Sequence, residues 1–146
     1  MDNKPSAIIG VEKQVCFSLY SASNAVIRAY RPILDKLGLT YLQYMAMIVL
    51  WQHAPLNVKE IGHKLHLDSG TLTPLLRRLE DKGLVTRTRS ERDERVRQIS
   101  LTEQGRALEA QALDVPADIA CRVKLSAEDT LALKRICDLV NANLLE

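Results

Sequence analysis

The chain has 146 residues, 47% of them hydrophobic, and a formal net charge of +2, which predicts one domain with an ordinary core. Only 4% of the residues are aromatic, and six glycines and five prolines argue against a disordered or β-rich composition. No apolar run approaches the roughly 18 residues that span a membrane. The start, Met-Asp-Asn-Lys-Pro, lacks the layout of a signal peptide, so we expect a cytoplasmic protein. Three widely spaced cysteines do not predict a secreted disulfide framework.

Positive charge is concentrated in one segment. Residues 77–97 hold eight Lys or Arg against five Asp or Glu. That segment therefore carries a net +3, which leaves −1 for the rest of the chain. A local basic patch on a nearly neutral protein indicates a specific anionic partner rather than a general polycation.

The first predicted helix spans residues 7–37. Its apolar residues form two neighbouring stripes at helical spacing: Val15, Leu19, Ala22, Val26, Ile33 and Leu37 in one, and Cys16, Tyr20, Ile27, Tyr30 and Leu34 in the other. Because a peripheral helix needs one stripe for its own core, the second predicts contact with another chain. Pro32 is expected to kink or locally break this helix near its C-terminal end.

A helix-turn-helix follows a central helix. Thr40 and Gln43 form a capping-box pattern that predicts a helix over 41–53, apolar nearly all round and therefore buried. Helices at 57–66 and 71–82, joined by a short turn, have the spacing of a helix-turn-helix. Pro74 fits the first turn if Thr71 is the cap, whereas a start at residue 69 would cost a backbone hydrogen bond.

The second of these helices has the pattern of a recognition helix. Leucines at 72, 75, 76 and 79 make one buried stripe, while hydroxyls and arginines face outward. Strands at 84–88 and 96–101 then flank a loop, Arg89 to Arg95, that has no apolar residue. A charged hairpin after a helix-turn-helix predicts a wing whose arginine enters a minor groove, and Asp93 could pair with Arg95 and hold it extended. The predicted DNA contacts are Ser69, Thr71, Thr73, Pro74, Arg77, Arg78, Arg87, Arg89, Asp93 and Arg95.

The C-terminal part predicts helices that pack on the first helix, either within one subunit or between subunits. One runs from residue 103 to about 120 with an interruption near Pro116, and Ser126 caps the last. No catalytic pattern, phosphate-binding loop or paired carboxylates stand out. His63 and His66 are three residues apart, but without a third ligand at suitable spacing they predict a polar helix face. We therefore expect no metal, no cofactor and no enzyme.

Several motifs together resemble the winged helix-turn-helix regulators of the multiple-antibiotic-resistance (MarR) family. They are Leu67-Asp-Ser-Gly-Thr-Leu-Thr-Pro-Leu-Leu-Arg-Arg-Leu-Glu-Asp-Lys-Gly-Leu-Val-Thr-Arg, Asp93-Glu-Arg95 and Ile99-Ser-Leu-Thr-Glu-Gln-Gly105. Within that family the chain is similar to the organic-hydroperoxide-sensing branch (OhrR). The narrower resemblance rests on Gln14-Val-Cys16-Phe-Ser-Leu-Tyr20, Tyr30 and Leu39-Thr-Tyr41-Leu-Gln-Tyr44.

The resemblance implies a mainly α fold with a small β-wing. Residues 1–146 would be a single subunit, in which 40–102 bind DNA and helices 7–37 and 103–145 form the dimerisation region. It further implies a homodimeric repressor on a palindromic operator, with Asp93 orienting Arg95 in the minor groove.

The resemblance also implies how repression is relieved. An organic hydroperoxide would oxidise Cys16, to which Tyr30 and Tyr41 of the partner subunit bond. Cys121 corresponds to the resolving cysteine of two-cysteine members, and we expect an intersubunit disulfide between Cys16 and Cys121. Cys137 has no corresponding role, and its place on the apolar face of the last helix predicts core packing.

The spacing of two of these residues supports a site between subunits. Cys16 and Tyr30 are 14 residues apart, which is about 21 Å along a continuous helix. They cannot touch within one subunit but can meet across a two-fold axis.

Two alternatives remain open. A MarR-type repressor could instead be released by a reversible small aromatic effector, in which case replacing Cys16 by Ser would leave induction unchanged. A thiol peroxidase would need an activating Arg or His beside Cys16 and has no use for a wing, and steady turnover of peroxide with a thiol reductant would identify it.

Overall fold

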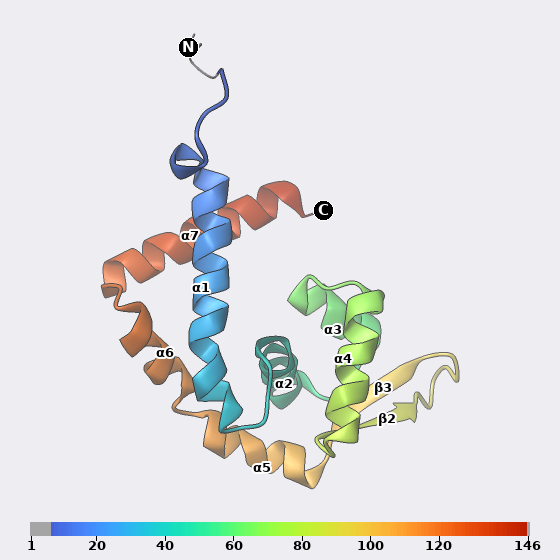
Figure 1. Cartoon of the computed structure of the whole chain (residues 1–146). Coiled ribbons are helices and arrows are strands. Elements are labelled where there is room, and N and C mark those ends of the chain that lie inside the picture. The colour runs from blue at the N-terminus through green and yellow to red at the C-terminus, as the bar shows by residue number, and fades with distance from the viewer. Residues whose placement is uncertain (1–6, 146) are drawn as a thin grey trace, which may run out of the picture.

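The computed structural model describes residues 7–145 as a helical subunit with a small antiparallel sheet (Figure 1). Its helices are α1 (Val15–Asp35), α2 (Tyr41–His53), α3 (Val58–Leu65), α4 (Ser69–Asp81), α5 (Glu103–Ala112), α6 (Val115–Val123) and α7 (Ala127–Leu144), preceded by a 3₁₀ turn, η1 (Val11–Lys13). Its strands are β1 (Leu56–Asn57), β2 (Val85–Arg89) and β3 (Arg97–Leu101). The predicted class, mainly α with a β-wing, is confirmed. The start of the chain, on which the expectation about a signal peptide rests, lies outside the described residues.

The elements separate into two regions. In Figure 1, α6 lies on one side of α1 and α2 on the other, α7 crosses the N-terminal half of α1, and α3, α4 and the wing lie beyond α2. None of the helices within 7–145 combines the length and hydropathy needed to cross a membrane.

Helix α1 is shorter at its start than the predicted 7–37. It begins at Val15, because Val11–Lys13 forms a separate 3₁₀ turn. Pro32 lies inside the helix, which nevertheless continues to Asp35, so the predicted break does not occur. Only Ile33 and Leu34 of this helix are buried in the subunit, which leaves most of its apolar surface facing outward.

Helix α2 is the centre of the core, as predicted. Thr40 and Gln43 form the expected capping box, with the Gln43 N–H donating to Thr40 Oγ1 and the Thr40 N–H donating to Gln43 Oε1. Ala46, Met47 and Leu50 are fully buried. This side of α2 supports the helix-turn-helix, whose leucines pack into the same cluster.

The start of α4 corrects the predicted cap. The helix begins at Ser69, and Asp68 rather than Thr71 is its N-cap: Asp68 Oδ1 accepts the Thr71 N–H at 2.7 Å. This hydrogen bond lowers the pKa of Asp68, and a carboxylate is also favoured by the helix dipole. Pro74 therefore lies within the helix and leaves the carbonyl of exposed Gly70 without its helical donor.

The sheet contains one strand, β1, that the sequence patterns did not predict. The strand order in the sheet is β1-β3-β2, and Leu56 of β1 lies opposite Ile99 of β3. The two wing strands begin one residue later than predicted. Past the wing, the interruption near Pro116 is confirmed as the α5–α6 junction, and the Ser126 side chain caps α7 by accepting the Asp129 N–H at 3.0 Å.

Candidate nucleic-acid interface and thiol site

Helix α4 presents a polar face on a tightly packed support. Its leucines at 72, 75, 76 and 79 are between 0% and 7% exposed, so the orientation of the helix is fixed by the core. Of the residues predicted to touch DNA on this helix, Thr73 is half-buried; the others are exposed: Ser69, Thr71, Pro74, Arg77 and Arg78. The helix can therefore offer hydroxyl and guanidinium donors to base edges and phosphates together.

The wing adds a second group of arginines. Arg89 and Arg95 are exposed, and Arg87 is half-buried. Asp93 Oδ1 accepts the backbone N–H of Arg95 at 3.0 Å, so Asp93 shapes the turn that carries Arg95 rather than pairing with its side chain. Within residues 7–145 the one ion pair joins Lys134 and Asp138, which leaves the Arg95 guanidinium available for an anionic partner.

The strand register identifies a further basic residue that the motif did not reveal. Arg97 lies directly opposite Arg89 in the β2–β3 ladder, and both are exposed. Like charges at such a pair repel each other, and a phosphate between them would relieve the repulsion. The sequence alone did not indicate this pair of arginines, because Arg89 and Arg97 lie on either side of the wing loop. Only the register of the strands shows that they face each other.

Tyr30 and Tyr41 come together at the corner between α1 and α2. Their ring centroids are 5.0 Å apart, and Tyr44 lies 6.1 Å from Tyr30. Burial raises the pKa of Tyr30, and the neighbouring Tyr41 and Tyr44 raise it further. Burial likewise raises the pKa of Tyr41. Both phenols are therefore protonated at neutral pH and can donate hydrogen bonds to a thiolate.

Cys16 lies at the other end of α1. It is exposed, and the helix is unbroken from Val15 to Asp35, so about 21 Å separates it from Tyr30 of the same chain. Cys121 is exposed on α6, and Cys137 is half-buried on α7. Each of these thiols is free in the structure. A contact between Cys16 and the tyrosines therefore needs a second subunit.

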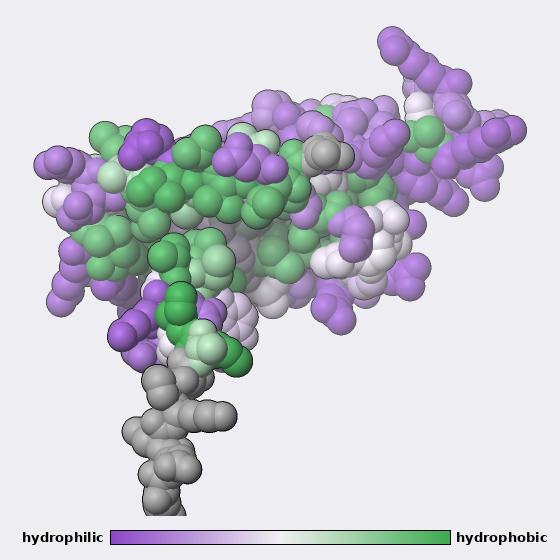
Figure 2. Space-filling view, turned by 90° about the horizontal axis from the view of Figure 1, so that it is seen from above, coloured by the Kyte–Doolittle hydropathy of each residue, from purple (hydrophilic) through white to green (hydrophobic). Residues whose placement is uncertain are grey.

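An exposed apolar surface offers a place for that second subunit. Helix α7 buries none of its residues within the subunit. Large apolar side chains stand exposed on α1 and α7: Val15, Phe17, Leu19, Tyr20, Ile27, Leu131, Leu133, Ile136, Leu139, Val140 and Leu144. Figure 2 shows hydrophobic residues gathered on the face that carries α7, with hydrophilic ones toward the wing.

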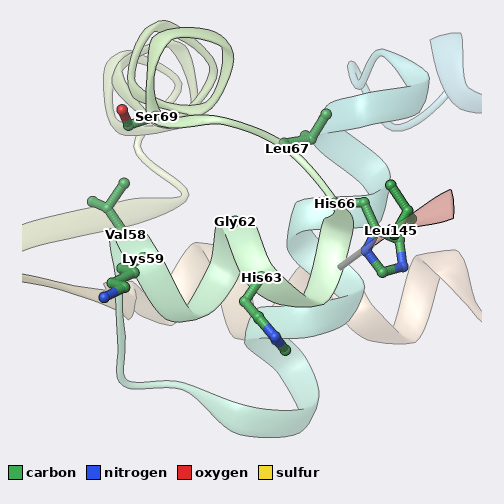
Figure 3. A pocket seen from close by; sticks show the side chains of 8 residues that line it. All are labelled: Val58, Lys59, Gly62, His63, His66, Leu67, Ser69 and Leu145. Atoms are coloured by element: carbon green, nitrogen blue, oxygen red, sulfur yellow. The ribbon is translucent and has the colours of Figure 1, made fainter. Parts of the chain in front are cut away.

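Two pockets lie near these elements. One, of about 480 Å³, lies beside the tyrosine pair and is lined by Ile27, Arg31, Asp35, Leu39, Thr40, Tyr41 and Leu42. The other, of about 800 Å³, lies between α3 and the end of α7 and is lined in part by His63, His66 and Leu145 (Figure 3). There the two histidines point in different directions, and within 7–145 no third potential metal ligand joins them.

Comparison with known proteins agrees with this arrangement. The chain is 52% identical over 124 residues to the organic hydroperoxide resistance transcriptional regulator of Bacillus subtilis (strain 168), covering 85% of this chain and 84% of that protein. A family model described as transcriptional regulator SarA/Rot matches residues 28–111. The chain belongs to the MarR/SarA-type winged-helix transcriptional regulators. The part of this regulator matched by the family model includes the helix-turn-helix, the wing and both tyrosines, but neither Cys16 nor Cys121.

Solved structures of AbfR of Staphylococcus epidermidis extend the likeness. The regulator matches reduced AbfR bound to DNA with a TM-score of 0.78 at 32% identity, over 93% of this chain and 95% of that chain. It matches disulfide-formed AbfR with a TM-score of 0.60 at 33% identity, over 92% and 89% of the two chains. The conformation described here is therefore nearer to the two DNA-bound forms of that protein, reduced (TM-score 0.78) and overoxidised (TM-score 0.75), than to its disulfide form.

Proposed function

We propose that this regulator is a homodimeric repressor that binds a palindromic DNA operator and is released when an organic hydroperoxide oxidises Cys16. Two of the similar proteins support the two halves of the proposal, since one is named for organic hydroperoxide resistance and another was solved on DNA in its reduced form. A cytoplasmic location goes with this role, because the operator and a reducing thiol pool are both found there.

The DNA-binding half assigns α4 to the major groove and the wing to the flanking minor groove. Two copies of α4 related by a two-fold axis would enter half-sites about 34 Å apart, one helical turn of DNA. Arg77 and Arg78 lie on the face that would meet base edges and phosphates, and Arg95 would enter the minor groove from the wing. The exposed faces of α1 and α7 would form the dimer interface, so the terminal helices set the distance between the two copies of α4.

The sensing half is a balanced two-step oxidation. The Cys16 thiolate attacks one oxygen of the hydroperoxide, so that an S–O bond forms while the O–O bond breaks, and the alcohol leaves after taking up a proton. The resulting sulfenic acid is attacked by the Cys121 thiolate of the partner subunit. An S–S bond forms, the S–O bond breaks, and the hydroxide that leaves takes up a proton to become water.

The observation that carries the sensing half is the position of the tyrosine pair. Tyr30 and Tyr41 hold two phenols 5.0 Å apart, between ring centroids, at the α1–α2 corner. Tyr30 lies about 21 Å along α1 from the Cys16 of its own chain, yet on the same apolar stripe of α1 as that cysteine. A second α1 crossing this stripe would bring its Cys16 against the phenols, which would donate hydrogen bonds to the thiolate and favour its oxidation.

The experiment begins with a DNA duplex selected from a randomised pool by repeated binding to the reduced protein. The parent, Cys16→Ser and Cys137→Ser proteins are titrated with this selected duplex before and after treatment with cumene hydroperoxide, and each is run on a non-reducing gel. After treatment, the parent and Cys137→Ser proteins are expected to lose DNA binding and to run as disulfide-linked dimers. The Cys16→Ser protein is expected to bind the duplex as it did before treatment. A failure to select any duplex contradicts the DNA-binding half, and release of DNA from Cys16→Ser contradicts the sensing half.

A further inference from the structure

A lysine ties the end of the recognition helix to the corner between α1 and α2. Lys82 is the C-cap residue of α4. Its Nζ donates to Gln43 Oε1 at 2.8 Å and to the backbone carbonyl oxygen of Gly38 at 2.5 Å. Residues 38 and 43 lie 44 and 39 positions earlier in the chain, so the contact is a long-range one between the DNA-reading helix and the first two helices.

The acceptor side of this contact is fixed. Gln43 is only 3% exposed, and among the described residues it is the one buried polar residue. Its Oε1 accepts the Thr40 N–H at 3.1 Å as well as Lys82 Nζ, so both lone pairs of that oxygen are used. Lys82 itself is exposed, but its removal would leave the buried Gln43 oxygen short of one donor, which costs free energy. This cost distinguishes the contact from one made by a freely moving surface lysine.

Gly38 fixes the second acceptor. Its φ of +67° places it in the left-handed region just beyond the end of α1. The chain then turns into α2, whose first residue is Tyr41. Lys82 therefore holds both sides of the corner at once, through a carbonyl that follows α1 and a side chain in the first turn of α2.

The same corner carries the tyrosine pair. Tyr30 comes from the second half of α1 and Tyr41 from the start of α2, so any change in the angle between these helices acts on both the phenols and the acceptors of Lys82. At the other end of the contact, Arg77 and Arg78 lie on the last turn and a half of α4. No other side-chain hydrogen bond described within 7–145 links α4 to this corner.

We propose that Lys82 is a positioning residue that couples the α1–α2 corner to the recognition helix. In the reduced protein the buried leucine stripe already holds α4 in the DNA-reading orientation, and the two hydrogen bonds of Lys82 pass movement of the corner after oxidation to the C-terminal end of α4. This inference rests on the proposed function, because it needs oxidation at Cys16 to act on the tyrosine pair. It concerns the route of the signal, not the chemistry that generates it.

The test replaces the donor while keeping the length of the side chain. Lys82→Met removes the two hydrogen bonds, and the leucine stripe of α4 remains buried, so the variant is expected to fold. Lys36→Met is the matched control: it removes the same charge from the exposed C-cap of α1, two residues from Gly38, where the structure gives the side chain no hydrogen bond. For each protein the affinity for the selected duplex is measured in the reduced and the cumene-hydroperoxide-treated states, and oxidation of the Cys16 peptide is followed by mass spectrometry.

The measured quantity is the factor by which oxidation weakens DNA binding, and couplings between sites typically amount to factors of about 5 to 150. Lys82→Met is expected to bind the duplex within about threefold of the parent when reduced and to oxidise Cys16 at the parent's rate. Its oxidation factor is expected to fall at least fivefold below those of the parent and Lys36→Met. An unchanged oxidation factor in Lys82→Met overturns the inference, as does an equal fall in Lys36→Met. If the parent itself shows no oxidation factor, the proposed function fails instead.

Discussion

If the thiol site spans two subunits, two different defective chains should complement each other. The first chain carries Cys16→Ser. The second carries Tyr30→Phe and Tyr41→Phe, which remove both phenol donors and keep the rings. In a mixed dimer of the two, the one remaining Cys16 belongs to the second chain and faces the intact tyrosines of the first.

The expected decrease in the rate of Cys16 oxidation follows from the strength of the hydrogen bonds that are lost. A hydrogen bond from a neutral donor to a charged group contributes about 1.5 kcal/mol or more, and a loss of that size slows a reaction of the thiolate about tenfold. The homodimer without phenols loses two such donors and is therefore expected to oxidise Cys16 at least about ten times more slowly than the parent. The mixed dimer should recover the parent's rate, because the distance of about 21 Å within one chain excludes any help from the cysteine's own tyrosines.

The assay uses two affinity tags to purify mixed dimers after co-expression. Oxidation of the Cys16 peptide by limiting cumene hydroperoxide is followed by mass spectrometry, which separates it from Cys121 and Cys137. The control mixed dimer pairs a parent chain with a chain that carries all three substitutions, and its Cys16 is expected to react slowly. A slow first mixed dimer together with a fast control dimer would refute the arrangement between subunits.

Three further predictions concern the core, the tyrosines and the wing. Leu76→Ala truncates a side chain that is 1% exposed, so urea denaturation is expected to show a loss of about 3 kcal/mol in the free energy of unfolding; a loss below 1 kcal/mol would contradict the packing described for α4. The pKa values of Tyr30 and Tyr41 are raised in the fold, so the neutral phenols contribute stability that is present below the unfolded pKa of about 10 and is lost as pH rises through the folded pKa values. The parent should therefore lose more stability between pH 9 and pH 11 than the double Phe variant. Equal losses would count against the burial of these rings. Arg95→Ala should weaken binding of the selected duplex about tenfold, more than Arg92→Ala, which removes the same charge from the same loop; equal effects would remove the special role of Arg95.

The strongly periodic elements could be predicted from the sequence because local spacing determines them. The leucine stripe of α4 needs only its own repeat to be read as a buried face. Thr40 with Gln43 and Ser126 with Asp129 are pairs three residues apart whose hydrogen bonds close within one helical turn. The wing strands were found to within one residue for the same reason.

The remaining features depend on competition or on distant contacts. Both Asp68 and Thr71 suit an N-cap, and the structure favours Asp68 although Pro74 then costs a backbone hydrogen bond. Strand β1 has only two residues and exists because it pairs with β3. The contact of Lys82 joins segments about 40 residues apart in the sequence, so no local sequence pattern predicts it.

The candidate site shows the same division. Tyr30 and Tyr41 were identified through a resemblance in motifs, and the structure places their rings side by side. Tyr44, which packs on Tyr30 and whose pKa is raised mainly by burial, was part of the motif without a role. Arg97 became a candidate only through its position opposite Arg89. Where Cys16 meets its partners depends on a second subunit, which no pattern within one chain can specify.

The most direct test of the redox account follows DNA release and thiol oxidation in one sample. Reduced parent protein on the selected duplex is titrated with substoichiometric additions of cumene hydroperoxide, and the fraction of bound DNA is plotted against the fraction of Cys16 that remains a thiol. The account predicts that DNA is released in proportion to the loss of the Cys16 thiol, and that reduction with dithiothreitol restores binding. Complete oxidation of Cys16 with the DNA still bound would contradict it.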